Sequence, residues 1–193
     1  VGASLLVRSF SRLTSVDPGV DLDRVLTARI SLPGARYPEG AKRAQFHADL
    51  AATLRTNAAV EEAASASFVP AGTGGFGLGR VFLPEGRPEP PAAADVPAQW
   101  NSITPAYFRA VGIKLIAGRE FSTADVLASQ KVTIVNEEFV KKFKLGRDAV
   151  GKMIGTGRGF RSPLDIVIVG VAQNAKYSQV KGQIPPLFFR PYR

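Results

Sequence analysis

Residues 131–146, KVTIVNEEFVKKFKLG, hold the clearest structural unit of the chain. The apolar run after Lys131 predicts a strand, and Asn136 stands where a side chain can cap the first turn of a helix. Two glutamates follow in the positive first turn and three lysines lie toward the negative end, which the helix dipole favours. Gly146 is the expected stop. The stretch therefore predicts a strand followed directly by a short helix.

Short strands and helices are expected on both sides of this unit. Thr104 is expected to cap a short helix that begins at Pro105 and stops at Gly112, because proline suits the first helical position and glycine suits a left-handed stop. The other expected elements are strands at 80–84, 96–104, 152–157, 164–174 and 185–193, a strand and turn at 113–121, and a capped helical turn at 122–125.

The first third of the chain predicts a strand, a helix and a second strand. In RVLTARISLP (24–33) the apolar residues at 26, 28, 30 and 32 share one face, which predicts a half-buried strand that ends at Pro33. Residues 41–57 carry apolar side chains every four positions and predict a helix, and residues 60–69 predict the second strand. The expected fold class is α+β, with mostly short strands and a few short helices.

A glycine- and proline-rich segment, residues 70–94, interrupts this pattern. Its composition predicts loops or a hairpin around one short strand, without an independent core. GTGGFGLGR (72–80) lacks the spacing of a dinucleotide-binding loop, so a flexible loop is favoured over a phosphate cradle. For a partner contact in this loop, Phe76 is the natural apolar anchor, flanked by Gly75, Gly77 and Leu78.

The composition, 45% hydrophobic and 21% charged, is that of a globular chain with a real core. Lys and Arg outnumber Asp and Glu by 25 to 16, and the formal charge of +9 fits nucleic acid, an anionic membrane surface or an acidic partner. The absence of cysteine excludes disulfides, zinc–thiolate sites and thiol nucleophiles. Residues 1–7 are uncharged and mostly apolar and are followed by Arg8 and Arg12, which fits either the last turns of a membrane helix or an amphipathic surface helix.

Residues 146–153, GRDAVGKM, have the spacing of a nucleotide phosphate-binding loop up to the last position. That position needs a hydroxyl for Mg²⁺ and holds Met153 instead. A true phosphate loop leaves a strand and opens a helix, whereas this stretch follows a predicted helix and leads into a strand. A helix stop and a turn explain it, and no nucleotide or other cofactor is expected here.

His47 is the only histidine, and Asp49 lies near it on the predicted helix. A Ser-His-Asp set also needs a placed nucleophile and an oxyanion hole, and the sequence has no nucleophile-elbow motif. One histidine without cysteine does not make a transition-metal site. The basic residues are scattered and follow no nucleic-acid-binding pattern. We therefore expect no catalytic residue, metal or nucleic acid, which favours a binding or mechanical module over an enzyme.

An ordered series of short motifs is more specific than any one of them. VLTARISLP is followed by a Tyr-Pro loop and a helix, then by VEEAASASFVP, TPAYFRAVGIKLIAGREF, VNEEFVKKF, AVGK and IVIVGVAQNAKY. This series resembles the periplasmic core domain of MacB-like, FtsX-like ABC transporter permeases, of the duplicated orphan type found in acidobacteria. The resemblance runs over nearly the whole chain.

The resemblance implies a domain on the periplasmic side of the inner membrane, inserted after a first transmembrane helix. Residues 1–20 would be the end of that helix and a linker, 21–70 the first half of a porter-like lobe, and 71–193 a mostly β lobe of the type called sabre. A cytoplasmic ABC ATPase would act through the rest of the permease, and this domain would relay the motion to export or to a periplasmic adaptor or lipoprotein. The alternative is a periplasmic module that binds a lipoprotein, an adaptor or a cell-wall ligand without transport coupling.

One departure from the family pattern concerns the porter-like lobe. In the family this lobe continues past a strand like that at 185–193 into a further strand-helix-strand unit. We therefore expect an incomplete first lobe with an exposed sheet edge, and a dimer through strand addition at that edge, of no functional meaning. A monomer with a covered edge would contradict this expectation.

Overall fold

The computed structural model describes residues 19–21, 23–70, 82–84, 98–127, 130–156, 164–177 and 183–192. The expected membrane-proximal segment is almost entirely outside these residues, as is the whole of the glycine-rich loop at 72–79. No helix of the described part is long and apolar enough to cross a membrane.

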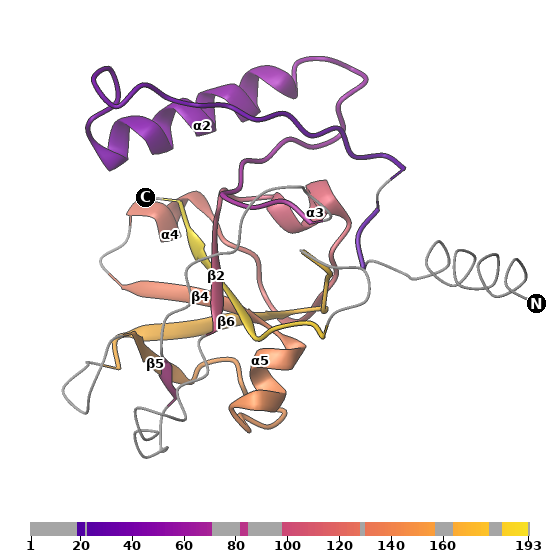
Figure 1. The fold of residues 1–193 in the computed structure, drawn as a ribbon, viewed down its shortest axis with the longest axis vertical. Coiled ribbons are helices and arrows are strands. Elements are labelled where there is room, and N and C mark those ends of the chain that lie inside the picture. Colours follow the sequence, from indigo (N-terminus) through magenta and orange to yellow (C-terminus); the bar gives the residue numbers. More distant parts are fainter. Residues whose placement is uncertain are drawn as a thin grey trace, which may run out of the picture.

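The described residues form one mixed sheet of seven strands, with the order β1-β5-β6-β4-β7-β2 and with β3 paired to β6 (Figure 1). The α+β fold class is confirmed. The sheet contains two parallel pairs, β2 with β7 and β4 with β6, and its other pairs are antiparallel. The strands are β1 (Phe82–Pro84), β2 (Gln99–Ile103), β3 (Leu115–Gly118), β4 (Lys131–Asn136), β5 (Met153–Thr156), β6 (Ile166–Ala172) and β7 (Leu187–Pro191).

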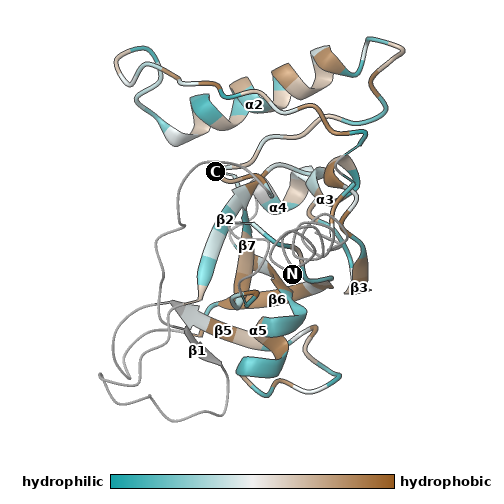
Figure 2. Ribbon diagram, turned by 45° about the vertical axis from the view of Figure 1, so that its right-hand side comes forward, coloured by the Kyte–Doolittle hydropathy of each residue, from teal (hydrophilic) through white to brown (hydrophobic). Residues whose placement is uncertain are grey.

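Four helices are described: α2 (Gly40–Leu54), α3 (Tyr107–Val111), α4 (Thr123–Leu127) and α5 (Glu137–Lys142). The sheet buries a hydrophobic cluster on each face, one with Tyr107 and Phe108 of α3 and the other with Phe139 of α5. Successive residues of β7 alternate between the two clusters, because side chains of a strand point to opposite faces. Figure 2 shows the apolar colours concentrated on the strands.

The strand and helix expected at 131–146 are confirmed. The Asn136 side chain accepts a hydrogen bond from the Phe139 N–H at 2.9 Å, as an N-cap does. The expected stop at Gly146 is wrong, because α5 ends at Lys142. Lys144 takes the left-handed conformation, with φ of 52°, and Leu145 N–H donates to the Val140 carbonyl at 3.0 Å. This is the closing bond of a Schellman motif, with a lysine in the place that glycine usually takes.

The helix of the first third is confirmed as α2, but the strand expected before it is wrong. Residues 24–33 are extended without strand pairing, and residues 25–32 form no hydrogen bond with any other described residue. Leu26 is 97% exposed and Ile30 46% exposed. An alternating pattern is not sufficient for a strand, because a strand forms only where a partner strand satisfies its backbone groups. None of the described residues lies in register to do so.

The strand expected at 60–69 is reduced to a single bridge, between Ala66 and Ile103 of β2. Ser67 N–H donates to the Ser102 carbonyl and Thr104 N–H donates to the Ser65 carbonyl, both at 2.9 Å. The Asn101 side chain then binds the Phe68 N–H and carbonyl, so a side chain replaces the next strand bonds. This part of the chain therefore covers one end of the β2 edge.

Thr104 also departs from its expected role. Its hydroxyl accepts a hydrogen bond from the Ser65 N–H at 2.8 Å, and α3 begins at Tyr107 without a side-chain cap. The expected glycine stop of α3 is confirmed, because Gly112 has a φ of 73°. The dimer expected through strand addition stays a prediction, and sedimentation equilibrium of the chain would test it.

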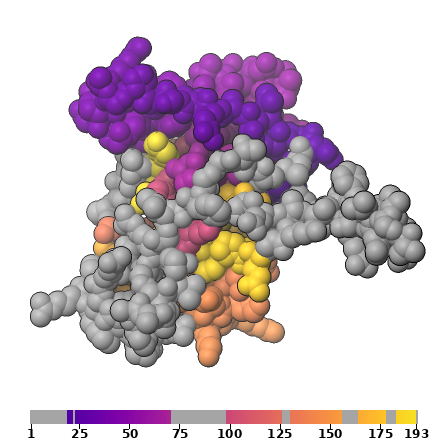
Figure 3. Space-filling model, viewed as in Figure 1, coloured from indigo at the N-terminus to yellow at the C-terminus, as the bar shows by residue number. Residues whose placement is uncertain are grey.

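We call residues 23–64 the α2 unit, and we call the described residues of 82–84 and 98–192 the sheet unit. In Figures 1 and 2 the extended segment before α2 runs alongside this helix, at one end of the sheet. Figure 3 shows the atoms of this first part gathered as one mass at that end. Only Ala51 of α2 is buried. Ala44, Phe46 and Leu50 are half-buried, and the Phe46 ring packs edge-on against Tyr37, with ring centroids 5.5 Å apart.

Candidate functional site

The residues proposed from sequence for partner contact, Gly75, Phe76, Gly77 and Leu78, lie outside the described residues. Their role stays a prediction. The described residues contain no group of three or more His, Cys, Asp or Glu side chains that could hold a metal ion.

The phosphate-loop-like stretch joins α5 to β5. Lys152, which would contact phosphate in a true phosphate loop, donates from Nζ to the Leu145 carbonyl at 2.7 Å. Gly151 has a φ of 89°, and its N–H donates to the Ile168 carbonyl of β6. The lysine therefore closes the end of α5, and the glycine brings the turn onto the sheet.

His47 lies on α2 with Ser65 as its polar partner, at 3.0 Å between Nδ1 and Oγ. Asp49, the carboxylate expected near it, accepts from Gln45 instead. In a catalytic triad the serine faces Nε2 and the carboxylate faces Nδ1, whereas here Nδ1 faces the serine and Asp49 is bonded to Gln45. The His47 ring also packs edge-on against Tyr192 of the sheet unit, with ring centroids 4.8 Å apart. The geometry gives His47 a packing role at the junction of the two units.

Burial lowers the pKa of His47 from its ordinary value of 6.5. The folded chain then binds fewer protons than the unfolded chain just below that pH, so we expect the free energy of unfolding to fall as the pH drops below about 6.5. His47 is the only histidine of the sequence. Chemical denaturation at pH 7.5 and 5.5 should show a smaller pH dependence in His47→Gln than in the unmodified chain.

The two chains must be compared because burial also raises the pKa of Glu120, and this shift makes the free energy of unfolding rise as the pH falls. The difference between the pH dependences of the two chains removes the contribution of Glu120. An equal pH dependence in both chains would contradict the assignment to His47.

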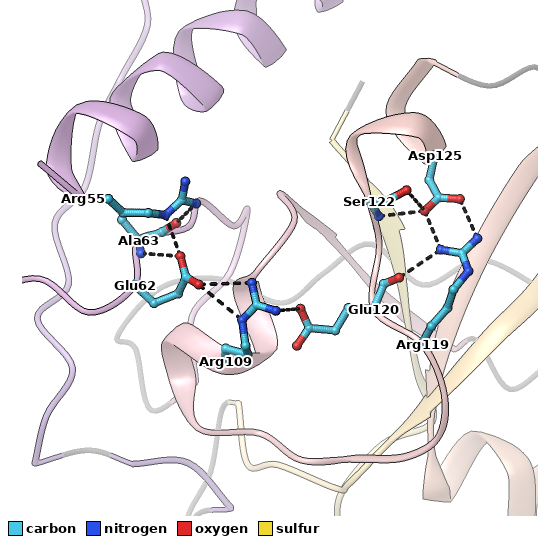
Figure 4. A network of polar contacts seen from close by, with 8 residues as sticks. All are labelled: Arg55, Glu62, Ala63, Arg109, Arg119, Glu120, Ser122 and Asp125. Carbon is cyan, nitrogen blue, oxygen red and sulfur yellow. Dashed lines mark hydrogen bonds and ion pairs between the residues drawn. The ribbon is translucent and has the colours of Figure 1, made fainter.

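A polar network of the described residues joins four charges of alternating sign, which we call the charge chain: Arg55, Glu62, Arg109 and Glu120 (Figure 4). Arg55 Nε lies 2.6 Å from Glu62 Oε1. The other Glu62 oxygen, Oε2, accepts from Arg109 Nη2 at 3.1 Å and from Nε at 3.3 Å. Arg109 Nη1 lies 3.6 Å from Glu120 Oε2. The first two residues belong to the α2 unit and the last two to the sheet unit.

The two carboxylates of this chain have opposite pKa shifts. Burial acts to raise the pKa of Glu62, but hydrogen bonds from the Ala63 N–H, Arg55 and Arg109 together outweigh it and leave this pKa below its ordinary value. Burial raises the pKa of Glu120, which Arg109 offsets only in part and the neighbouring Glu62 charge reinforces. Glu62 is therefore the more strongly held anion of the two.

A second ion pair fixes the backbone around Glu120. Arg119 donates to both oxygens of the buried Asp125, at 2.7 and 2.9 Å, and Nη1 also donates to the Glu120 carbonyl at 3.0 Å. Asp125 accepts from the N–H and hydroxyl of Ser122 as well. The Arg119 hydrogen bonds hold the pKa of Asp125 well below its usual range. The capped turn expected at 122–125 is confirmed. The ion pair between Arg119 and Asp125 was not predicted from the sequence.

No pattern in the amino-acid sequence predicts the charge chain. Glu62 and Arg109 are 47 positions apart, in segments expected to be a strand and a short helix. Exposed charges of this kind look the same in sequence whether or not they meet. Only the fold brings them together.

The comparisons with known proteins agree with the series of motifs in the sequence. The family model for the MacB-like periplasmic core domain matches residues 5–193. The chain belongs to the family of MacB-like periplasmic core domains. No curated protein sequence matches it.

Three solved structures match parts of this chain at low sequence identity. The periplasmic region of MacB from Actinobacillus actinomycetemcomitans is 18% identical, with a TM-score of 0.48, and the match covers 76% of this chain and 55% of that one. A permease-protein domain from Porphyromonas gingivalis is 19% identical, with a TM-score of 0.43 and coverage of 68% and 50%. The extracellular domain of the noncanonic ABC-type transporter YknZ from Gram-positive bacteria is 15% identical, with a TM-score of 0.39 and coverage of 59% and 52%. The match thus spans about half the length of each.

Proposed function

We propose that this chain is the extracytoplasmic domain of an ABC transporter permease, located on the periplasmic side of the inner membrane. It is non-catalytic and relays motion driven by a cytoplasmic ATPase to export or to a periplasmic partner. The observation that carries this proposal is the family match over residues 5–193. The ATPase acts through the membrane part of the permease, and the partner is an adaptor or a lipoprotein.

The way the two units are joined supports a mechanical role. The α2 unit is connected to the sheet unit at Asp21, whose N–H donates to the Val111 carbonyl at 3.1 Å, and at residues 65–68, which bind β2. Ala51 is the one fully buried residue of α2, and Phe46 and Leu50 are half-buried, so the apolar burial that opposes movement of this helix is smaller than that of the sheet core. We propose that the α2 unit corresponds to the first half of the porter-like lobe (21–70) and the rest to the sabre-like lobe (71–193).

The exposed apolar residues of the extended segment favour the second candidate, a binding module without transport coupling. Leu26 and Ile30 are exposed on a segment with unpaired backbone groups, which is what strand addition by a partner requires. If the domain is such a binding module, its conformation would change when its ligand binds and would not depend on ATP hydrolysis in the parent protein.

The location of the domain can be tested with one cysteine, because these 193 residues contain none. In spheroplasts that produce the parent protein with Ala48→Cys, at an exposed position of α2, a membrane-impermeant maleimide should label the introduced thiol. The parent protein without this substitution is the control for cysteines elsewhere. Labelling that occurs only after the inner membrane is permeabilised would overturn the proposed location.

A further inference from the structure

We propose that the charge chain is a reversible electrostatic switch that holds the α2 unit against the sheet unit and divides at its centre, between Glu62 and Arg109, when the two units separate. This inference rests on the proposed relay of motion, because it names the contact that the motion would break. The switch is formed by residues of this domain alone and operates without a ligand.

The Glu62–Arg109 contact lies at the boundary between the two units, so its breaking controls their separation. Among the ion pairs between described residues, it is the one that joins the α2 unit to the sheet unit. The boundary is also crossed by the ring packing of His47 on Tyr192, by the packing of Ala64 on the core of the sheet unit, and by the hydrogen bonds of Asp21 and residues 65–68. Because residues 65–68 stay bound to β2, they can act as the pivot about which the α2 unit moves.

The alternation of charges allows the contact to break without leaving an unpaired ion. After division, Glu62 keeps Arg55, which lies 2.6 Å away in the α2 unit. Arg109 keeps Glu120 in the sheet unit. Each half is a neutral pair, so neither side carries the penalty of an uncompensated charge that normally opposes the breaking of a partly buried ion pair. Two arrangements of similar free energy are what a switch needs.

The sheet side of the contact is rigid. Arg109 projects from α3, whose Tyr107 and Phe108 are buried in the core at 2% and 1% exposure. The Arg119–Asp125 pair fixes the backbone that carries Glu120. Arg109 is therefore presented at a constant position, and the α2 unit is the part that moves toward it or away.

The switch can be tested by the distance between spin labels at Ala48→Cys on α2 and Lys114→Cys on the sheet unit, both exposed positions in a chain without native cysteine. We expect a joined and a separated population. Arg109→Gln should raise the ratio of separated to joined molecules about two- to fivefold, which is the size expected for a mostly exposed ion pair. High salt should raise the ratio in the unmodified chain and leave it unchanged in Arg109→Gln.

Arg55→Gln distinguishes the proposed switch from a general effect of removing one positive charge from the surface. It removes the cation that Glu62 keeps after division, so separation should become less favourable and the ratio should fall. Lys131→Gln, which breaks the Lys131–Asp165 pair inside the sheet unit, is the matched control and should leave the ratio unchanged. A single distance in all variants, or shifts of Arg55→Gln and Arg109→Gln in the same direction, would overturn the proposal. Because no nucleotide is used, this result is independent of whether the parent protein is a transporter.

Discussion

Gly118→Ala is expected to destabilise the domain by about 3 kcal/mol or more. Gly118 has a φ of +75°, which strains any residue with a Cβ. A Cβ added there would lie 2.1 Å from the Val169 carbonyl oxygen and 2.8 Å from the Gly170 Cα, and both atoms belong to the backbone of β6. The same oxygen accepts the Arg119 N–H at 2.9 Å. The substitution therefore pushes β3 off the central strand of the sheet.

Gly146→Ala is the matched control for this prediction. Gly146 has nearly the same φ, +74°, but a Cβ there would meet no atom within 4 Å. This variant should lose only about 1 kcal/mol, the cost of the left-handed conformation. Urea denaturation of both variants measures the difference. Equal losses would mean that β3 does not approach β6 as closely as described.

Asn136→Ala is expected to cost about 3 kcal/mol of unfolding free energy. The buried Asn136 oxygen accepts from both the Phe139 and the Leu187 N–H groups, each at 2.9 Å, and its amide donates to the Pro185 carbonyl at 3.0 Å. Alanine would leave the start of α5 uncapped and would leave two groups at the start of β7 without their partner. One side chain thus joins β4, α5 and β7.

Asn57→Ala is the control for the loss of an asparagine side-chain hydrogen bond at the surface. The Asn57 side chain accepts from the Ala59 N–H at 3.0 Å in an exposed turn, where water can replace it. We expect a loss of well under about 1 kcal/mol. A loss in Asn136→Ala as small as this, in the same thermal or urea unfolding experiment, would show that the buried network adds nothing to the cap.

Local signals in the sequence were sufficient for most of the sheet and for its helices. The apolar runs in β4 and β7 reflect two buried faces, and Asn136 caps α5 because short polar side chains favour that position. The same reasoning failed at Leu26, where an alternating pattern met no partner strand among the described residues. A strand is a property of a pair, whereas a helix satisfies its own backbone.

The end of α5 and the contact between Glu62 and Arg109 could not be predicted from local patterns in the sequence. Lys144, and not Gly146, is the left-handed residue that ends α5, and the apolar Leu145 after it returns to the core. Glu62 meets Arg109 only because residues 65–68 bind the edge of β2. Contacts between distant exposed charges depend on the whole fold and leave no periodic signal in the sequence.

The central claim is that ATP hydrolysis elsewhere moves this domain. The most direct test is the distance between spin labels at Ala48→Cys and Lys114→Cys in the parent permease, reconstituted with its ATPase in a lipid bilayer. We expect the ratio of separated to joined molecules to differ between the nucleotide-free and the vanadate-trapped states, and the difference to shrink in Arg109→Gln. The same distance distribution in both nucleotide states, while ATP is hydrolysed, would contradict the account.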